Sequence, residues 1–178
     1  NSHVFISELG GPAVFSGVVT RDIPGAAGRF SPEQVRAAFR VPSPHSPRTR
    51  LVWVENTHNA SGGRIWPLEE IDELREVCDE LGLRYHLDGA RLLNASAGTG
   101  VAAAEIGRRF DTVTLCFSKG LGCPLGALLA GRSEAMGNAR RLKHLFGGAM
   151  RQAGIVAAAG VYALEHNVAG LADDHVRA

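Results

Sequence analysis

The residues best suited to chemistry in this chain are a lysine, an aspartate and an arginine that follow apolar runs. Lys119 comes shortly after the apolar run 113–117, and Asp88 ends the alternating run 83–88, with Arg91 three residues further on. A lysine amine can act as a Schiff-base nucleophile, and pyridoxal phosphate (PLP) chemistry adds an acidic partner for the pyridine nitrogen. An arginine fork binds a carboxylate through two parallel hydrogen bonds. The stretch between Asp88 and Lys119 is long enough to hold a helix and a strand.

Lysine is scarce in this chain, which makes each lysine informative. Of the 19 basic residues, 17 are arginine and only Lys119 and Lys143 are lysine. Lys143 stands in a basic stretch with Arg140, Arg141 and His144, which is typical of a solvated helix face. Lys119 differs because an apolar run precedes it and a glycine-rich turn follows it. We therefore predict that Lys119 is the nucleophile.

Two other kinds of site use similar residues. His86 and Asp88 stand two apart on one predicted strand and could both bind a metal, but no third and fourth ligands occur at workable spacing. No metal site is predicted. Gly120 and Gly122 begin a Gly-x-Gly pattern, but the third glycine of a dinucleotide-binding fingerprint is not at its place. Cys123 is expected to be a small packed residue.

Strand and helix patterns alternate along the chain and would position these residues. Short apolar or alternating runs predict strands at 51–54, 83–88, 113–117 and 125–130. A helical apolar period predicts a helix from Pro67 to a stop at Gly82, and further helices are expected at 32–39, 102–109, 134–145 and 152–164. The proline-rich segment 41–50 is predicted to be a loop. This alternation predicts one α/β domain with a mainly parallel sheet sandwiched by helices.

Polar residues follow three of the predicted strands directly. They are residues 55–59 after the first, Asp88 to Arg91 after the second and residues 118–120 after the third. In open α/β sheets, ligands bind in the crevice outside the carboxyl ends of the strands. We therefore expect these segments to line the binding site.

Composition excludes disordered, collagen-like and disulfide-scaffold proteins. The chain has 178 residues, 45% hydrophobic and 21% charged, with a formal net charge of +1. These values are typical of globular proteins and do not suggest a nucleic-acid partner. Three cysteines without Cys-x-x-Cys spacing favour a reducing cytoplasm. The longest apolar run, 153–164, is shorter than the ~20 residues of a membrane span.

Five motifs together resemble the L-threonine aldolase family, whose members are low-specificity, PLP-dependent enzymes of fold-type I in the aspartate aminotransferase superfamily. The strongest are HLDGARL at 86–92 and SKGLGCPLG at 118–126. The others are SHVFISE at 2–8, LVWVENTHN at 51–59 and GGAMRQ at 147–152. The motifs occur in the family's order along the whole chain.

The resemblance implies a role for each candidate residue. Lys119 would form the Schiff base with PLP, and Asp88 would pair with the pyridine nitrogen. Arg91 would hold the substrate carboxylate or help to anchor the cofactor. His3 would stack on the PLP ring, and His45 would lie near the substituent on the substrate's β-carbon. Both His3 and His45 are candidates for the base that takes the β-hydroxyl proton, and the sequence does not choose between them.

The resemblance also implies a reaction and an assembly. The enzyme would be a carbon–carbon lyase that cleaves L-threonine and L-allo-threonine to glycine and acetaldehyde, in threonine catabolism and glycine formation. Residues 1–178 would be the central part of the large PLP-binding domain, with a phosphate-binding segment before it and a small domain after it. The whole protein would be a homotetramer built as a dimer of dimers. For the 178-residue chain alone we expect weak PLP binding or none.

Two rival interpretations stay open. A related PLP-dependent β-eliminating lyase that acts on aromatic amino acids would use the same lysine and aspartate. A non-catalytic fragment would keep the fold for binding or assembly. The joint presence of Asp88, Arg91 and Lys119 argues against the second rival.

Overall fold

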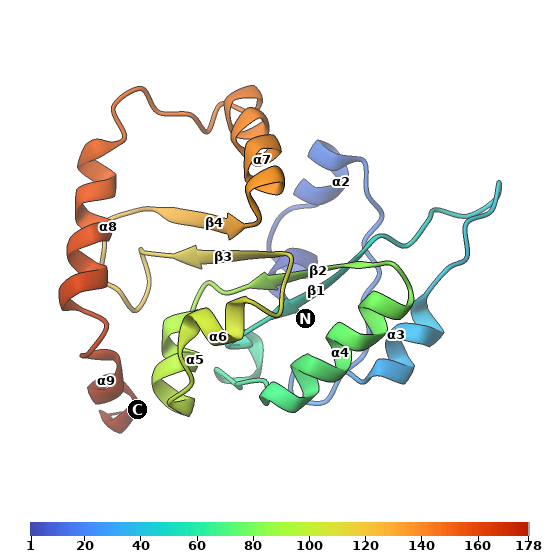
Figure 1. Cartoon of the computed structure of the whole chain (residues 1–178), viewed down its shortest axis with the longest axis horizontal. Coiled ribbons are helices and arrows are strands. Elements are labelled where there is room, and N and C mark those ends of the chain that lie inside the picture. Colours follow the sequence, from blue (N-terminus) through green and yellow to red (C-terminus); the bar gives the residue numbers. More distant parts are fainter. Residues whose placement is uncertain (178) are drawn as a thin grey trace. The chain divides into compact units, whose positions relative to one another are not determined.

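The computed structural model describes residues 1–177 and contains four strands in one sheet (Figure 1). The strands are β1 (Leu51–Glu55), β2 (Arg84–Asp88), β3 (Thr112–Cys116) and β4 (Ala127–Gly131), in the order β1-β2-β3-β4. The chain forms two compact units, Asn1–His86 and Leu87–Ala178, whose boundary falls inside β2.

The first unit is organised around one amphipathic helix. Its helices are α1 (His3–Ile6), α2 (Gly11–Ser16), α3 (Pro32–Ala38), the 3-10 helix η1 (Asn59–Ser61) and α4 (Leu68–Glu80). α4 follows Pro67, carries acidic residues in its first turn and buries one face, which consists of Ile71, Leu74, Val77 and Cys78. This spacing of three and four residues is the one that places side chains on one side of a helix.

α3 packs against α4 within this unit. Its first turn is fixed by a capping box, in which Ser31 and Gln34 satisfy each other's backbone N–H groups. Arg36 of α3 also pairs with Glu80 of α4, with Nη2 at 2.6 Å from Oε2. Both side chains of this ion pair are exposed, so its contribution to stability is small.

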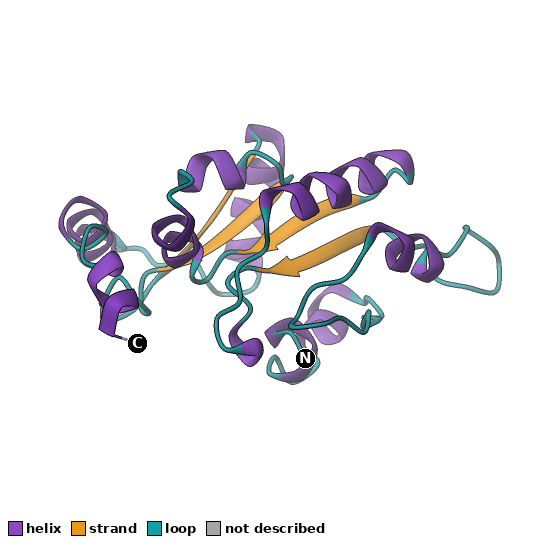
Figure 2. Ribbon diagram, turned by 90° about the horizontal axis from the view of Figure 1, so that it is seen from below, coloured by secondary structure: helices purple, strands orange, loops and turns teal. Residues whose placement is uncertain are grey.

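The second unit contains five helices besides its strands. They are α5 (Leu92–Thr99), α6 (Ala103–Gly107), α7 (Ser133–Leu145), α8 (Gly154–His166) and α9 (Leu171–Arg177). α5 packs against α6 and α9, and α7 lies against β4. Leu121, Cys123 and Ala163 form a small buried cluster beside Phe117. Figure 2 shows the strands in orange with the helices and loops that join them.

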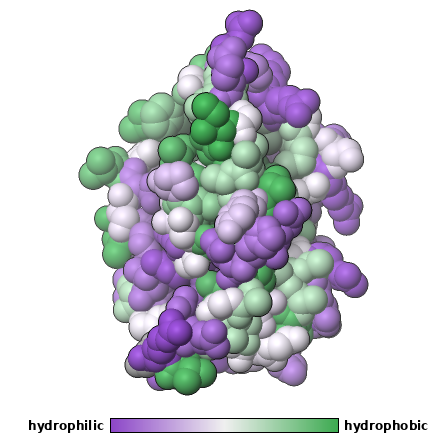
Figure 3. Space-filling model, turned by 90° about the vertical axis from the view of Figure 1, so that its left-hand side faces the viewer, coloured by the Kyte–Doolittle hydropathy of each residue, from purple (hydrophilic) through white to green (hydrophobic). Residues whose placement is uncertain are grey.

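Much apolar surface of the second unit is exposed. β4 has no buried residue, and none of the residues of α7 is buried. On α8, the exposed side chains include Ile155, Val161 and Tyr162. Hydrophobic residues are visible at the surface in the view of Figure 3. Among the described residues no single helix is long and apolar enough to cross a membrane. The pair α8 and α9, bent by 70° at its break, passes the same test of length and composition.

The four predicted strands and five predicted helices are confirmed within a few residues at their ends, and segment 41–50 forms the expected loop. Two findings differ in detail. β3 and β4 pair antiparallel, with Cys116 opposite Ala127, so the sheet is mixed. The alternation of apolar and polar residues along β2 is not matched by an alternation in burial, because His86 is only 5% exposed. Its ring lies 4.2 Å from that of Trp53, and this aromatic contact explains how a polar residue is accommodated.

Candidate active site

Asp88 is the last residue of β2 and is half-buried. Its Oδ1 accepts a hydrogen bond of 3.1 Å from the backbone N–H of Ala90, which closes a short turn. Between them, Gly89 has no room for a side chain, because an added Cβ would lie 2.6 Å from the backbone oxygen of Thr114. The glycine therefore lets the end of β2 approach β3 closely, and this fixes the position of the Asp88 backbone.

Arg91 stands at the N-cap of α5, directly after this turn. Its carbonyl oxygen accepts hydrogen bonds from the N–H groups of Asn94 at 3.0 Å and Ala95 at 3.1 Å. The first helical turn thus holds the backbone of Arg91. The turn and the helix start together fix the spacing between the backbones of Asp88 and Arg91.

Lys119 lies in the turn after β3 and is exposed. The N–H of Gly122 donates a 2.8 Å hydrogen bond to the carbonyl oxygen of Lys119. The next residue, Gly120, packs closely on α5 and α9, since an added Cβ would meet Asn94 Oδ1 of α5 at 2.9 Å and Leu171 Cδ2 of α9 at 3.0 Å. The second unit therefore holds the residue after Lys119 against the helix that Arg91 begins.

The far side of this turn is anchored in the small apolar cluster. Leu121 and Cys123 are 3% and 8% exposed, and the Cys123 thiol donates to the carbonyl oxygen of Ala159 at 3.4 Å. The expectation that Cys123 is a packed residue is confirmed. Asn167 Nδ2 donates to the carbonyl oxygen of Leu121 at 2.8 Å, which adds a polar tether.

In the first unit, His3 is held by a buried glutamate at the end of β1. The backbone N–H of His3 donates to Glu55 Oε2 at 2.7 Å, and its Nδ1 lies 3.1 Å from Glu55 Oε1. The N–H of Asn59 also donates to Oε1, at 2.9 Å. Burial tends to raise the pKa of Glu55, but the hydrogen bonds from Asn59 and His3 outweigh it and lower the pKa.

His58 lies beside this pair and is also buried. Its Nε2 is 3.2 Å from Ser2 Oγ, so Ser2 and His3 are both tied to the segment that follows β1. Burial lowers the pKa of His58, although Glu55 acts in the opposite direction. The ring lies against Gly28, where an added Cβ would be 2.2 Å from His58 Cγ.

Two buried donors or acceptors in this segment have no hydrogen-bond partner among residues 1–177. They are Asn56 Nδ2 and His58 Nδ1. The other end of the Asn56 side chain is satisfied, because Oδ1 accepts from the N–H of Trp66 at 3.3 Å. Buried polar groups in folded proteins are nearly always hydrogen-bonded, to protein or to ordered water.

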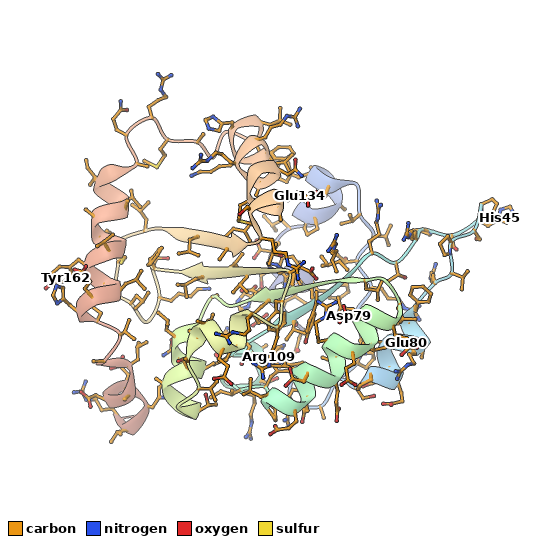
Figure 4. All side chains as sticks on the ribbon, in the orientation of Figure 1. His45, Asp79, Glu80, Arg109, Glu134 and Tyr162 are labelled. Carbon is orange, nitrogen blue, oxygen red and sulfur yellow. The ribbon has the colours of Figure 1, made fainter. Side chains whose placement is uncertain are left out.

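His45 is placed differently from His3. It lies in the loop between α3 and β1, exposed, and its backbone N–H donates to Ser43 Oγ at 3.2 Å. Figure 4 shows His45 at the tip of this loop, projecting beyond α3. The structure of the first unit therefore brings His3 to Glu55 but leaves His45 at the surface.

Sequence reasoning identified residues 55–59 as lining a crevice but assigned no role to Glu55 or His58. The signal for Glu55 was an acidic residue directly after a buried strand. Its partner could not be read from the sequence, since His3 lies far from Glu55 along the chain. Only the fold brings the two residues together.

Comparisons with known proteins agree on one family. The family model described as beta-eliminating lyase matches residues 1–178. The chain is 41% identical to the low specificity L-threonine aldolase of Escherichia coli K12 over 175 residues, 98% of this chain and 52% of that protein. It is 37% identical to low-specificity L-threonine aldolase 1 of Arabidopsis thaliana over 181 residues, 100% of this chain and 51% of that protein. The chain thus spans about half the length of these relatives.

Solved structures give the same result. A Listeria monocytogenes protein provisionally named an L-allo-threonine aldolase matches with a TM-score of 0.82 and 27% identity, over 97% of this chain and 46% of that chain. The threonine aldolase of Leishmania major matches with a TM-score of 0.70 and 26% identity, over 82% of this chain and 43% of that one.

Proposed function

Because this chain belongs to the beta-eliminating lyase family, we propose that it is about half of a PLP-dependent threonine aldolase. The whole protein would cleave L-threonine and L-allo-threonine to glycine and acetaldehyde. The observation that carries the proposal is the arrangement in the second unit. There the turn after Lys119 packs on α5, and Asp88 and Arg91 lead into the start of that helix. The similarity to proteins named threonine aldolases supports the choice of substrate.

The donor set fits PLP. A lysine amine, a carboxylate on the end of a strand and an arginine at a helix start are the groups that a PLP site requires. Lys119 would hold the cofactor covalently, and Asp88 would keep a proton on the pyridine nitrogen. When bound, PLP supplies an electron-accepting ring that makes the substrate's Cα–Cβ bond cleavable.

The chain's own residues would orient the substrate and move protons. The guanidinium of Arg91 would bind the substrate carboxylate bidentately, which fixes the direction of the bond to be broken. A histidine would accept the β-hydroxyl proton as acetaldehyde leaves. Between the two candidates, we favour His3, because His45 lies at the tip of an exposed loop in its own unit (Figure 4).

The decisive experiment compares the two lysines of this chain in the full-length protein. Lys119→Ala should abolish acetaldehyde release from L-threonine, and Lys143→Ala, on the exposed face of α7, should leave it unchanged. Borohydride reduction followed by peptide mapping should find the pyridoxyl group on Lys119. Threonine cleavage that survives in Lys119→Ala would overturn the assignment.

A second candidate function shares this site. The family description itself names β-elimination, so a lyase that releases phenol or indole from aromatic amino acids remains the rival. Assaying acetaldehyde, phenol and indole with the same preparation separates the two. Release of phenol or indole without acetaldehyde would favour the rival.

We also propose that the full-length protein is a homo-oligomer, built as a dimer of dimers. The exposed apolar side chains of α7 and α8 support this proposal, because soluble monomers rarely leave such large apolar areas uncovered. Sedimentation of the full-length protein would measure its oligomeric state.

A further inference from the structure

The contact between His3 and Glu55 decides where the imidazole carries its proton. Both carboxylate oxygens of Glu55 face N–H groups: Oε2 accepts from the backbone of His3, and Oε1 accepts from Asn59 and faces His3 Nδ1. An ionised carboxylate can only accept hydrogen bonds. Nδ1 must therefore carry a hydrogen to make its 3.1 Å contact favourable.

From this geometry we infer that Glu55 is a positioning residue that holds neutral His3 in the Nδ1–H form, with Nε2 as the proton-accepting atom. This inference rests on the proposed function for the role of His3, which would lie against the cofactor and take the substrate's hydroxyl proton. A carboxylate that fixes the tautomer and the orientation of a histidine is a recurrent device in enzymes.

Burial makes this contact specific. The Glu55 residue is 4% exposed, and a buried charge must be matched by hydrogen bonds, which here come from two backbone N–H groups and one imidazole. The His3 side chain remains 33% exposed, so the ring is accessible although one edge is fixed. Glu55 therefore holds both the backbone and the ring of the same residue.

A neighbouring contact provides a matched control. Ser2 Oγ lies 3.2 Å from His58 Nε2 and ties the same segment to the residues after β1 without involving the His3 ring. Ser2→Ala removes this tether and leaves both contacts between His3 and Glu55 in place. Glu55→Gln keeps the size of the side chain but replaces one oxygen by an NH₂ group. Whichever way this amide turns, its NH₂ group faces one of the N–H groups from which the carboxylate accepts, so the negative charge that favours a hydrogen on Nδ1 is lost.

The test uses the full-length protein, labelled with ¹⁵N at histidine, at a pH where the rings are neutral. His3→Gln identifies the His3 signals by their disappearance. Wild type and Ser2→Ala should show a protonated Nδ1 and an unprotonated Nε2 for His3. Glu55→Gln should show a smaller share of the Nδ1–H form.

Kinetics on the PLP-loaded protein provide the second readout. Glu55→Gln should lower kcat for L-threonine by about 10- to 100-fold with a much smaller change in KM, because the imidazole loses the carboxylate that fixes its tautomer and orientation. Ser2→Ala should change kcat by less than about threefold, because it removes one part-buried hydrogen bond that does not involve the His3 ring. A Glu55→Gln enzyme with wild-type kcat would overturn the inference.

The wild-type spectrum decides the matter even if Glu55→Gln does not fold. A neutral His3 with its proton on Nε2 in the wild type would show that Glu55 does not set the tautomer. If the full-length protein does not cleave threonine at all, the proposed function fails. The tautomer measurement still tests the contact on its own.

Discussion

Several ionisable side chains of the first unit are buried, and burial changes the pH at which they take up protons. Burial lowers the pKa of His86 to about 4, from an ordinary value of 6.5. The pKa values of His58 and Glu55 are also lowered, by burial for the histidine and by hydrogen bonds that outweigh burial for the glutamate. Because folding depresses all three pKa values, mild acid should destabilise this unit.

His86 should make folding stability depend on pH between about 6.5 and 4. Below pH 6.5 the unfolded chain binds a proton at His86, but the folded chain does not do so until about pH 4. The contribution of His86 to the free energy of unfolding should therefore be fully present above pH 6.5. It should fall by about 3 kcal/mol towards pH 4 and then level off. His86→Phe, which keeps a ring beside Trp53, should lose this component.

Denaturant titrations at several pH values measure the effect. His144→Gln, at an exposed histidine on α7, is the control and should retain the full pH dependence. Parallel curves for wild type and His86→Phe would contradict the prediction.

A second residue-scale prediction concerns the glycine beneath His58. Gly28→Ala places a Cβ 2.2 Å from His58 Cγ at a backbone φ of +80°. Gly62→Ala meets a similar φ of +73° with nothing within 4 Å. Gly28→Ala should cost about 1–3 kcal/mol more than Gly62→Ala, because only the first displaces a buried ring. Urea denaturation of the two variants measures the difference in the free energy of unfolding. Equal losses of stability would show that the His58 ring moves aside at little cost.

Among the elements, α4 and α7 have the same length but opposite surroundings. Both span 13 residues, yet α4 buries four of its residues and α7 buries none. Their amphipathic patterns are similar in the sequence. The difference lies in what covers the apolar face of each helix, which the pattern alone does not contain.

This contrast predicts unequal costs for the same substitution. Leu74→Ala on α4 removes a side chain that is 0% exposed and should destabilise the protein by about 2–5 kcal/mol. Leu142→Ala on α7, at a side chain that is 44% exposed, should cost less than about 1 kcal/mol in this chain. Thermal unfolding of the two variants checks the order, and a larger loss for Leu142→Ala would reverse our view of α7.

The sequence predicts elements well where one face is apolar, as in α4 and β1. Helices α1 and α2 were missed because they span only four and six residues, and α5 was missed because its sequence, LLNASAGT, has no repeating apolar period. The burial of His86 does not follow from the sequence, because alternation describes side-chain polarity, not the aromatic neighbour that the fold supplies. The positions of Asp88 and Lys119 near the carboxyl ends of β2 and β3 were predicted, because an alternating run ends at Asp88 and an apolar run comes shortly before Lys119.

The whole chain consists of two compact units that differ in how well their elements are covered. Helix α4 of the first unit has a buried face, whereas α7 and β4 of the second unit have no buried residue. Local stability follows the density of buried apolar contacts. We therefore expect local unfolding of the poorly covered elements at a lower free energy than global unfolding of the chain.

Hydrogen exchange on the 178-residue chain should reveal this difference. Backbone amides in the middle of α4 should exchange only through extensive unfolding, whereas those of α7 should exchange through local opening with a free energy close to zero. Mass spectrometry of peptic fragments resolves the two helices in one experiment. Equal protection of α7 and α4 would show that α7 is supported by contacts that burial does not reveal.

The missing side chain at Gly89 has a consequence for enzyme engineering. An added Cβ would lie 2.6 Å from a backbone oxygen of β3, and a backbone atom cannot rotate out of the way. A randomised library at this codon should therefore return glycine alone among its folded members. Efforts to change substrate preference beside Asp88 would gain more from Ala90, which is half-buried and has a side chain to vary.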